Sequence, residues 1–369
     1  MPDALTLVQR FYSLGRMAEA QAAAGAEVHV LERFWRDEDL TNNGVCYCFR
    51  SDDPNLLQAK ATTMPHKLLH QLARLQPDVV HVHGLLFPAQ LLQVRWVLGK
   101  RATLVAQHHT ERPKLGWRRA LQRLGLRCAH GFLFTAHGLV DEWRSANLIS
   151  PTQPVHDVIE ASCDFGMLPQ GPSRTNTGLT GNPAILWVKR LHLSKDPLTA
   201  LRGFAQACQS LPHAHLWMIY GEDQNLDLVQ NVLHSHAGLA ERVTLVGRKP
   251  RHELPAWYSA ADLSLTTSLY ESCNNALFES LACGALPVCS DIPPHQRLTG
   301  DGAHGVLCHT GDAADCARAI CQAAQQQTPQ RRLTLRKWFE TQLSWDAIAQ
   351  HSLRAYRAIK EHQKHDAKN

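Results

Sequence analysis

The sequence has 369 residues, enough for two domains at roughly 150 residues each. Its 38 Lys and Arg against 33 Asp and Glu give a net charge of +5, and only 19% of residues are charged, which excludes a disordered chain and a nucleic-acid binder held by bulk charge. The longest apolar runs fall far short of the roughly 20 residues that cross a bilayer, and charged residues interrupt the N-terminal segment, so we expect a cytoplasmic protein without a transmembrane helix or signal peptide.

Short apolar, β-branched runs alternate with longer helical stretches, which predicts parallel sheets with helices on both faces. The opening segment, residues 1–24, reads as a helix, whereas a doubly wound domain normally opens with a strand and a glycine-containing turn. Either the chain begins late, or residues 3–8 take a strand role. The strands expected after this segment are residues 28–31, 79–82, 103–106, 131–135 and 155–159, then 184–188, 215–220, 243–246, 262–267, 286–290 and 306–308.

Residues 166–183 are rich in Gly, Pro, Ser and Thr and are the best candidate for an interdomain linker. We therefore expect one domain over residues 1–168, a second domain over residues 169–340, and a C-terminal helix over residues 341–369. Ligands of such sheets bind beyond the carboxyl ends of the strands, so the cleft between the domains is the expected active site.

Several residue patterns that could bind metals or nucleotides do not meet the requirements of those sites. The 11 cysteines show no CxxC pair, and none of the 22 histidines belongs to an HExxH motif, so we predict reduced cysteines and no metal. Residues 300–305 satisfy GxGxxG but precede a strand instead of joining a strand to a helix. The Asp-Glu-Asp of residues 37–39 mimics a metal-binding DxD motif, and we interpret it as a solvated loop.

The most informative segment is residues 269–288. Glu271 follows an expected strand, and Asn274 or Asn275 can cap a helix over residues 276–283, which Gly284 ends. The N-terminus of a helix presents free N–H groups and a partial positive charge to an anion.

Two cations belong to the same predicted domain. Arg190 and Lys195 follow the strand over residues 184–188. Together with the helix N-terminus they describe a diphosphate site, in which each charge-assisted contact contributes roughly 1.5–3 kcal/mol.

At these residues the chain resembles the family 4 glycosyltransferases of the GT-B fold. Glu271 and Glu279 match the paired-Glu signature of the family, and residues 280–288 (SLACGALPV) resemble its "EAMACGTPVV" segment. Residues 188–191 with Lys195 resemble its "GRL…KG" pattern, and the likeness extends over about residues 10–360. It implies an α/β fold of two doubly wound, Rossmann-like domains that face each other across a cleft, here without the first N-terminal strand. The first domain would bind the acceptor and the second the nucleotide sugar, and the C-terminal helix would pack back toward the first domain.

The resemblance also implies roles for single residues. Arg190 and Lys195 would neutralise the leaving diphosphate, Glu279 would bind the ribose hydroxyls, and Glu271 would contact the donor sugar. Backbone amides that would contact phosphate or sugar belong to Cys273, Asn274 and Asn275.

His109 matches the histidine that the family places beside the donor sugar, although the neighbouring His108 could take that role. The usual Glu-Gly-Phe-Gly opening reads Glu-Ser-Cys-Asn over residues 271–274, so fewer glycines allow close backbone approach. Arg297 stands where many members carry Glu.

The implied reaction is transfer of a hexose, with retention, from a nucleotide-diphosphate donor to a hydroxyl of a carbohydrate or lipid-linked acceptor. No metal or other cofactor is required, and surface polysaccharide or glycolipid assembly is the expected setting. A retaining glycosidase is less suitable because Glu279 lies about one turn inside the helix that Glu271 precedes. An epimerase or phosphorylase on the same fold fits the paired-Glu segment less well. The alternative is a degenerate GT-B module that binds sugar nucleotide or a partner without turnover.

Residues 95–127 carry nine Lys or Arg against a single Glu. Trp117, Leu121, Leu124 and Cys128 form an apolar stripe at helical spacing. The segment predicts peripheral contact with an anionic membrane at its inner face, whereas the alternative is a packed helix with a solvated basic face.

Overall fold

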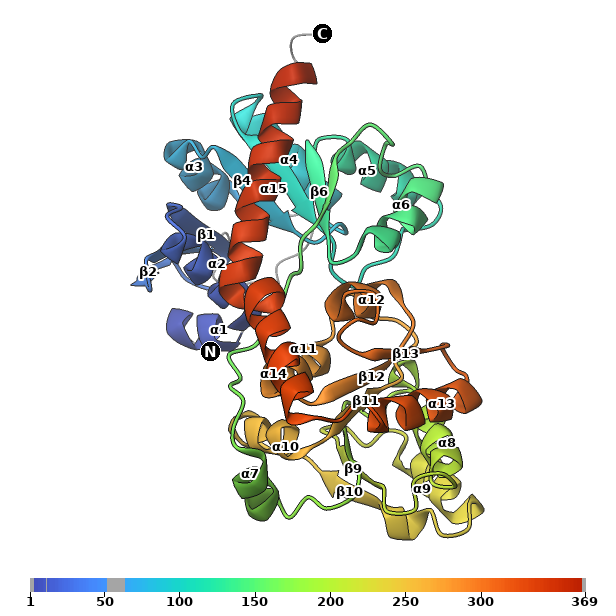
Figure 1. Cartoon of the computed structure of the whole chain (residues 1–369). Coiled ribbons are helices and arrows are strands. Elements are labelled where there is room, and N and C mark those ends of the chain that lie inside the picture. Colours follow the sequence, from blue (N-terminus) through green and yellow to red (C-terminus); the bar gives the residue numbers. More distant parts are fainter. Residues whose placement is uncertain (1–2, 11, 52–63, 367–369) are drawn as a thin grey trace. The chain divides into compact units, whose positions relative to one another are not determined.

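A computed structural model describes residues 3–10, 12–51 and 64–366 of the chain (Figure 1). The contacts of the chain divide it into two compact units. Unit 1 comprises Met1–Ala161 and Trp345–Asn369, and unit 2 comprises Ser162–Ser344. The boundaries expected after residues 168 and 340 both fall inside unit 2 in this division.

The described part of unit 1 contains two sheets. In the four-stranded sheet, the order is β4-β5-β6-β7 and all neighbours are parallel. Its strands are Val79–His83, Thr103–Gln107, Gly131–Phe134 and Val155–Asp157. The three-stranded sheet has the order β1-β3-β2, with β1 parallel and β2 antiparallel to β3. Its strands are β1 (Val28–Arg33), β2 (Glu38–Asn42) and β3 (Val45–Arg50).

The β2–β3 hairpin was not expected from the sequence. Asn43 and Gly44 join its strands with φ of 47° and 79°, the left-handed conformation that Asn-Gly turns favour. The interpretation of residues 37–39 as a solvated loop is wrong, since Glu38 and Asp39 belong to β2. Arg50 holds the Asp39 carboxylate at 2.6 Å across the hairpin.

The described N-terminal residues are helical. They form α1 (Ala4–Arg10) and α2 (Tyr12–Ala23), so the alternative that residues 3–8 take a strand role is wrong. The Asp3 carboxylate accepts a hydrogen bond of 2.8 Å from the backbone N–H of Thr6, which stabilises the first turn of α1.

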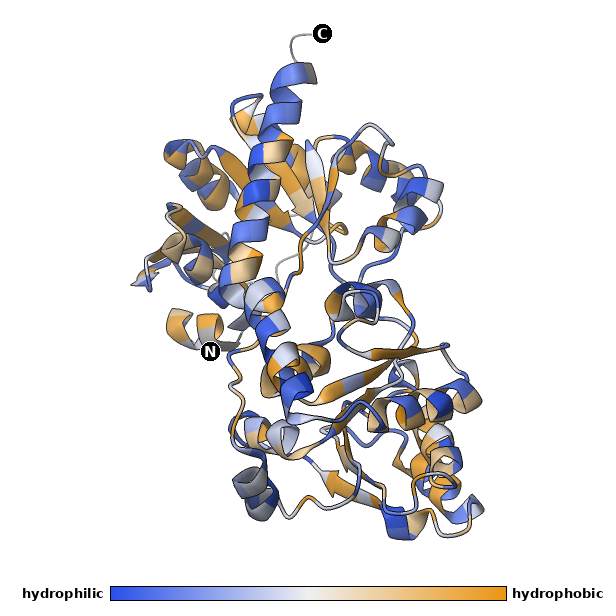
Figure 2. Ribbon diagram, in the orientation of Figure 1, coloured by the Kyte–Doolittle hydropathy of each residue, from blue (hydrophilic) through white to orange (hydrophobic). Residues whose placement is uncertain are grey.

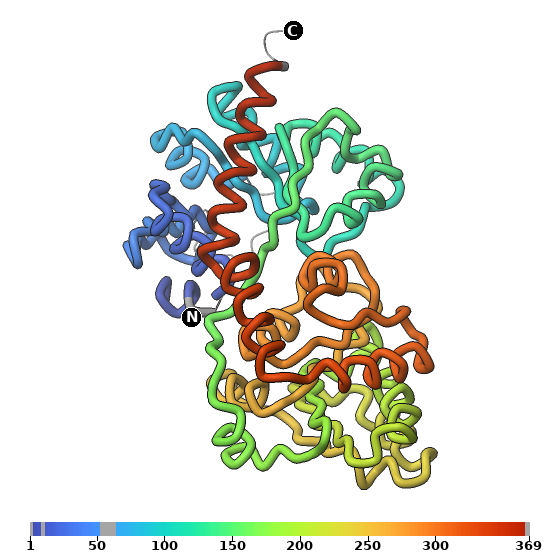
Figure 3. The backbone as a smooth tube through the Cα atoms, viewed as in Figure 1, coloured from blue at the N-terminus to red at the C-terminus, as the bar shows by residue number. Residues whose placement is uncertain are grey.

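Helices cover the sheets of unit 1, and the C-terminal helix belongs to this unit (Figure 3). The helices are α3 (His66–Leu75), α4 (Pro88–Leu98), α5 (Trp117–Leu126), η1 (His137–Val140), α6 (Asp141–Ser145) and α15 (Trp345–Asp366). Gln21 of α2 donates to Ser352 at 2.8 Å and to Tyr356 at 3.0 Å. These buried bonds fix α15 against α2, more than 300 residues earlier in the chain.

Unit 2 is one six-stranded parallel sheet of order β10-β9-β8-β11-β12-β13. Its strands are β8 (Ala184–Val188), β9 (His215–Ile219), β10 (Val243–Gly247), β11 (Leu263–Thr266), β12 (Leu286–Ser290) and β13 (Val306–Cys308). The chain builds outward from β8 to β10 and then returns to add β11 on the other side of β8. The loops after β8 and β11 are therefore neighbours at the carboxyl edge, at the point where such sheets bind ligands.

The helices of unit 2 are α7 (Gln170–Thr177), α8 (Pro197–Ala207), α9 (Leu226–Ser235), α10 (Leu254–Ala260), α11 (Asn275–Cys283), α12 (Pro293–Thr299), α13 (Ala313–Ala324) and α14 (Pro329–Trp338). Short 3-10 turns cover Leu193–Lys195 (η2), Ala240–Arg242 (η3) and Arg251–Glu253 (η4), and a π-helical turn covers Phe339–Leu343 (η5). The expectation that residues 166–183 form a linker is wrong, because α7 lies there. Asp262 holds Arg174 of this helix at 2.6 Å.

Each unit has its own apolar interior, and many strands of the parallel sheets are orange, the hydrophobic colour, in Figure 2. In unit 1 the core includes the fully buried Leu91, Leu104, Phe132 and Trp143. In unit 2, β8, β11 and β12 are buried along almost their whole length, as is typical of parallel strands covered on both faces.

Candidate functional site

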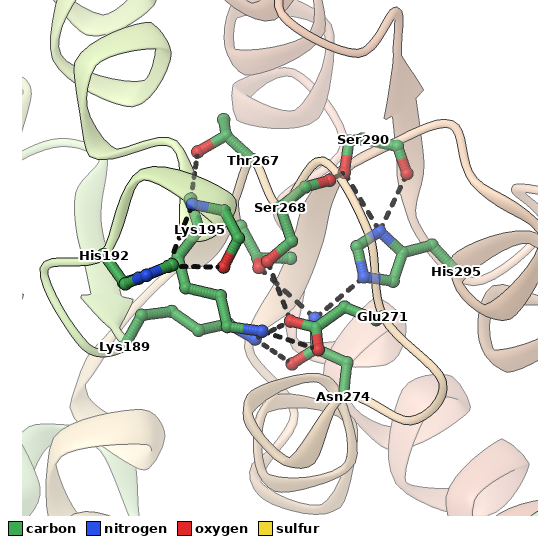
Figure 4. A network of polar contacts seen from close by, with 11 residues as sticks. Lys189, His192, Lys195, Thr267, Ser268, Glu271, Asn274, Ser290 and His295 are labelled. Carbon is green, nitrogen blue, oxygen red and sulfur yellow. Dashed lines mark hydrogen bonds and ion pairs between the residues drawn. The ribbon is translucent and has the colours of Figure 1, made fainter. Parts of the chain in front are cut away.

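The loops after β8 and β11 place the ammonium groups of two lysines against the carboxylate of one glutamate (Figure 4). The ammonium of Lys189, directly after β8, lies 3.0 Å from Oε1 of Glu271. The ammonium of Lys195, in η2, lies 2.8 Å from Oε2 of the same carboxylate. All three side chains are buried or nearly so, with exposed fractions of 6–14%.

Glu271 is ionised in this setting. Burial by itself raises the pKa of its carboxyl group, but the charges of Lys189 and Lys195 outweigh burial and hold the pKa at about 2. Burial lowers the pKa of Lys189, and the Glu271 carboxylate opposes that shift. The cluster therefore combines one fixed negative charge with two ammonium groups.

Two loop contacts hold Lys195 in place. The Thr267 hydroxyl donates to the carbonyl of Asp196 at 2.7 Å, and the backbone N–H of Leu269 donates to the carbonyl of Ser194 at 2.9 Å. Asp196 in turn caps α8 by accepting from the backbone N–H of Thr199. The loop after β11 is thereby tied to η2, so the Lys195 ammonium has a defined position.

Asn274 stands at the N-terminal cap position of α11, yet its side chain does not cap that helix. Its Oδ1 accepts from the Lys189 ammonium, while its Nδ2 lies 2.8 Å from Nε2 of His295. The first N–H groups of α11 therefore donate no hydrogen bond to the Asn274 side chain. Among the residues singled out by sequence, Asn275 begins α11 as an exposed residue and Cys273 is half-buried in the loop before it.

His295 supports this network as a neutral imidazole. Because the Asn274 amide donates to Nε2, the proton of the ring sits on Nδ1, which donates to the Ser290 carbonyl at 2.8 Å. Burial, together with the nearby Lys189 charge, lowers the pKa of His295 to about 4. The Ser268 hydroxyl completes the network by donating to Oε1 of Glu271 at 2.8 Å.

Arg190 lies outside this cluster in the structure. Its side chain is 58% exposed, and its guanidinium lies 3.7 Å from the Glu222 carboxylate. Lys189, which the sequence had not singled out, reaches the site that was expected for Arg190. The sequence did contain a sign of this role. Lys189 replaces the glycine of the "GRL" pattern, and a charged side chain is unexpected at that position.

Glu279, in the second turn of α11, lies in the same unit. Its carboxylate accepts from the Arg251 guanidinium at 2.9 Å and is almost fully buried. Burial raises the pKa of Glu279, and the Arg251 charge partly opposes this. Burial and the neighbouring Glu279 charge raise the pKa of Tyr258 well above its ordinary value. Arg251 also lies over the Phe165 ring, with its guanidinium carbon 5.0 Å from the ring centre.

His109 belongs to unit 1, where it follows β5. Its Nδ1 pairs with the Glu160 carboxylate, and its Nε2 lies 3.3 Å from Nδ1 of His83. The Glu111 carboxylate fixes its backbone by accepting from its N–H at 2.7 Å. Burial lowers the pKa of His109. His108 is buried against the Phe134 ring, at 4.8 Å between centroids, whereas the His109 side chain is 33% exposed.

Solved structures share the fold of this chain. The sucrose-phosphate synthase of Thermosynechococcus elongatus matches with a TM-score of 0.68 at 19% identity, over 95% of this chain and 93% of that one. Anabaena Alr3699/HepE, solved in complex with UDP and glucose, matches with a TM-score of 0.64 at 14% identity, over 94% of this chain and 95% of that one. The architecture is that of the GT-B glycosyltransferases, as expected.

Two family models match the sequence, "Glycosyltransferase Family 4" over residues 12–156 and "Glycosyl transferases group 1" over residues 182–326. The GDP-mannose:cellobiosyl-diphosphopolyprenol alpha-mannosyltransferase of Xanthomonas oryzae is 25% identical over 69% of this chain and 67% of that protein. The D-inositol 3-phosphate glycosyltransferase of Nocardia farcinica is 28% identical over 55% of this chain and 47% of that protein. The chain therefore belongs to the family 4 glycosyltransferases.

In residues 3–10, 12–51 and 64–366, no helix is long and apolar enough to cross a membrane. Within those same ranges, no group of three or more His, Cys, Asp or Glu side chains is arranged to hold a metal ion.

Proposed function

We propose that this glycosyltransferase transfers a hexose, with retention, from a nucleoside-diphosphate sugar to a hydroxyl of a carbohydrate or lipid-linked acceptor, in surface polysaccharide or glycolipid assembly. The observation that carries the proposal is the cluster of Lys189, Lys195 and Glu271 at the switch point of the unit 2 sheet. Buried ammonium groups stabilise the charge that develops on a leaving diphosphate. The proposed reaction needs no metal, because lysines supply the neutralising charge.

The proposed residue roles combine the family resemblance with these positions. The buried Lys195 neutralises the diphosphate with only a weak contribution from the solvent-exposed Arg190, and the ionised Glu271 accepts hydrogen bonds from hydroxyls of the donor sugar. The buried Glu279 carboxylate accepts hydrogen bonds from the ribose hydroxyls. The backbone N–H groups at the start of α11, which no N-cap side chain occupies, donate hydrogen bonds to phosphate or sugar. His109 is the proposed catalytic residue of unit 1.

The relatives support the donor and acceptor classes. The Xanthomonas relative is named for GDP-mannose as donor and a diphosphopolyprenol-linked acceptor, and the Anabaena structure contains UDP and glucose. We extend to this chain the classes of these ligands, a nucleotide sugar and a carbohydrate or lipid-linked acceptor.

A two-stage experiment tests the proposal. Thermal unfolding is first measured with UDP-, GDP- and ADP-sugars, and the donor that raises the midpoint is then tested for transfer to lipid-linked and free oligosaccharides, with E271Q as the inactive control. NMR of the product shows whether the anomeric configuration is retained. Stabilisation without hydrolysis or transfer would favour a module that binds sugar nucleotide without turnover, and no stabilisation by any donor would refute the proposal.

We also propose that residues 95–127 contact an anionic membrane surface, which places the enzyme peripherally at the inner face. The structure has the apolar stripe of α5 on the outside: Trp117 is 74% exposed, and Leu124 is 54% exposed. Arg119 donates to the Ala146 carbonyl, and Arg123 donates to the Asn147 carbonyl. The exposed apolar stripe supports membrane contact over the alternative of a packed helix with a solvated basic face.

The position of α5 explains why its stripe stays exposed. Gly125 of α5 lies against α4, where an added Cβ would approach Pro88 to 2.5 Å. The face of α5 that contains Gly125 is therefore the one that packs against α4, and the apolar stripe lies on another face. Leu115 before α5 and Trp96 on α4 are also exposed, at 82% and 77%. Exposed Trp and Leu side chains among clustered Lys and Arg match the headgroup region of an anionic bilayer.

A further inference from the structure

Lys189 is a buried cation for which the family resemblance assigns no role. Its side chain is 9% exposed, whereas that of the next residue, Arg190, is 58% exposed. Both residues follow β8, but their charged groups are differently placed. Lys189 contacts Glu271 and Asn274 inside the site, while Arg190 lies near Glu222 in a solvent-exposed ion pair.

The charges around Lys189 do not balance in the free protein. The ion pairs that Lys189 and Lys195 make within the described residues are both with Glu271, so two ammonium groups share one carboxylate. Glu279, the other buried carboxylate of the unit 2 site, is paired with Arg251. A surplus buried positive charge costs desolvation energy, and an anionic ligand placed between the two ammonium groups would remove that cost.

We propose that Lys189 binds the diphosphate of the donor directly, together with Lys195, and contributes more to diphosphate affinity than Arg190 does. Glu271 holds both ammonium groups in the free protein, and the diphosphate replaces it as their anionic partner. This inference rests on the proposed function, because it assumes a nucleoside-diphosphate sugar as the donor.

The geometry favours a diphosphate over a smaller anion. The ammonium groups approach different oxygens of the carboxylate, Lys189 at Oε1 and Lys195 at Oε2, so each can contact a separate phosphate group. Lysine is a compact point charge with three donors, and it can turn from a carboxylate to a phosphate without losing hydrogen bonds. The exchange leaves the Glu271 oxygens free to accept from hydroxyls of the sugar.

The difference in burial explains why Lys189 should contribute more to diphosphate affinity than Arg190. An ion pair made by an exposed guanidinium is screened by water and contributes little, whereas a contact from a buried ammonium is strong. Lys189 also donates to Asn274, whose amide is fixed by His295, so its position is set before ligand binds. Little side-chain entropy is then lost on binding.

Calorimetric titration of the full chain with UDP, GDP and ADP, and with the matching monophosphates, tests the inference. K189M is compared with its neighbour R190M as the matched control. We expect K189M to weaken binding of the preferred diphosphate by about 10- to 100-fold and that of the monophosphate much less, since each charge-assisted contact is worth about that much. R190M should weaken diphosphate binding by less than about threefold, as befits an exposed ion pair.

Folding is controlled by two further variants. K189Q keeps a donor for Asn274, and K189M/E271Q removes one positive and one negative charge together, so both should retain a cooperative unfolding transition while binding diphosphate weakly. Equal diphosphate affinity in wild type and K189M, or an equal loss in R190M, would overturn the inference and leave the proposed function intact. A wild-type chain that binds no nucleoside diphosphate would overturn both.

Discussion

The Lys189 ammonium lies 3.0 Å from the Glu271 carboxylate, although the two residues are 82 positions apart in the chain. The contact joins the loop after β8 to the loop after β11, the two loops that meet at the switch point of the sheet. Because both side chains are buried, the ion pair affects the folding of unit 2 as well as its chemistry.

Replacing Glu271 should destabilise the protein in a pH-dependent manner. The pKa of Glu271 is about 2 in the folded state and 4.5 in the unfolded chain, so its contribution to stability is full above the unfolded pKa and is lost as pH falls from about 4.5 to about 2. E271Q leaves two buried lysines uncompensated and should cost about 3–5 kcal/mol at neutral pH. Denaturant unfolding near pH 7 and at about pH 3 measures this, and the deficit should shrink at the lower pH.

A matched control for that variant is E340Q. Glu340 is 54% exposed in its ion pair with Arg336, so its loss should cost at most about 1 kcal/mol. Equal stability of E271Q and wild type at neutral pH would contradict the electrostatic role assigned to Glu271.

Lys195 and Glu279 should affect different parts of the nucleotide. K195A should weaken diphosphate binding by roughly 10- to 100-fold while leaving the affinity for the nucleoside unchanged, because its ammonium contacts phosphate. E279A should weaken nucleoside and diphosphate binding alike, because the carboxylate contacts the ribose. Titration of both variants with nucleoside, monophosphate and diphosphate separates the two effects. Unchanged nucleotide affinity in both variants would disprove the site assignment.

His109 should matter for turnover more than for nucleotide affinity. H109A removes the imidazole that Glu160 and His83 hold in place and should lower kcat at least about tenfold, with nucleoside-diphosphate affinity within about threefold of wild type. H137Q is the control, since His137 is an exposed histidine of the same unit at 3.6 Å from Asp157. Transfer rates and diphosphate titrations give both quantities. Unchanged kcat in H109A would remove His109 from the site.

Unit 1 should be acid-sensitive because it buries neutral histidines. Burial, together with the neighbouring His109, lowers the pKa of His81 to about 3, from 6.5. Unfolding then takes up a proton below about pH 6.5, so the contribution of His81 to stability is full above that pH and falls as the pH drops toward about 3. Between near pH 7.5 and about pH 5, wild type should lose about 2 kcal/mol more than H81Q does.

The partner of His81 supports this direction, because Nδ1 lies 2.7 Å from the neutral Tyr356 hydroxyl and a hydroxyl does not stabilise a charged imidazole as a carboxylate would. Unfolding curves of wild type, H81Q and H137Q at the two pH values provide the measurement. An identical pH dependence in wild type and H81Q would show that His81 does not carry the effect.

Membrane contact should depend on the exposed side chains of α5. W117S/L121S should lose most binding to vesicles that contain phosphatidylglycerol, while wild type should bind them in a salt-sensitive manner and bind pure phosphatidylcholine weakly. L333S is the control, since Leu333 is a 51% exposed leucine of unit 2. Co-sedimentation measures the bound fraction. Equal binding of W117S/L121S and wild type would refute this surface.

Much of unit 2 could be predicted from local sequence. The expected strands agree with β8 to β13 to within one residue at each end, and the helix after Glu271 begins one residue earlier than expected and ends at Gly284, with φ of 77°. Apolar runs predict strands and a C-terminal glycine predicts the end of a helix. Both signals act over a few residues, so they depend little on the rest of the fold. In unit 1, the β2–β3 hairpin was missed although its Asn43-Gly44 turn is a known local signal.

What side chains do inside those elements was decided by the tertiary structure. The sequence predicted Asn274 or Asn275 as a helix cap, but the amide of Asn274 binds Lys189 and His295 instead. The stripe of α5 has helical spacing, yet periodicity does not tell which face a neighbouring helix covers. The sequence itself determined the family, the strands of unit 2 and the paired glutamates. The pairing of Glu271 with Lys189 followed from the strand order, which makes neighbours of loops that are far apart in the chain.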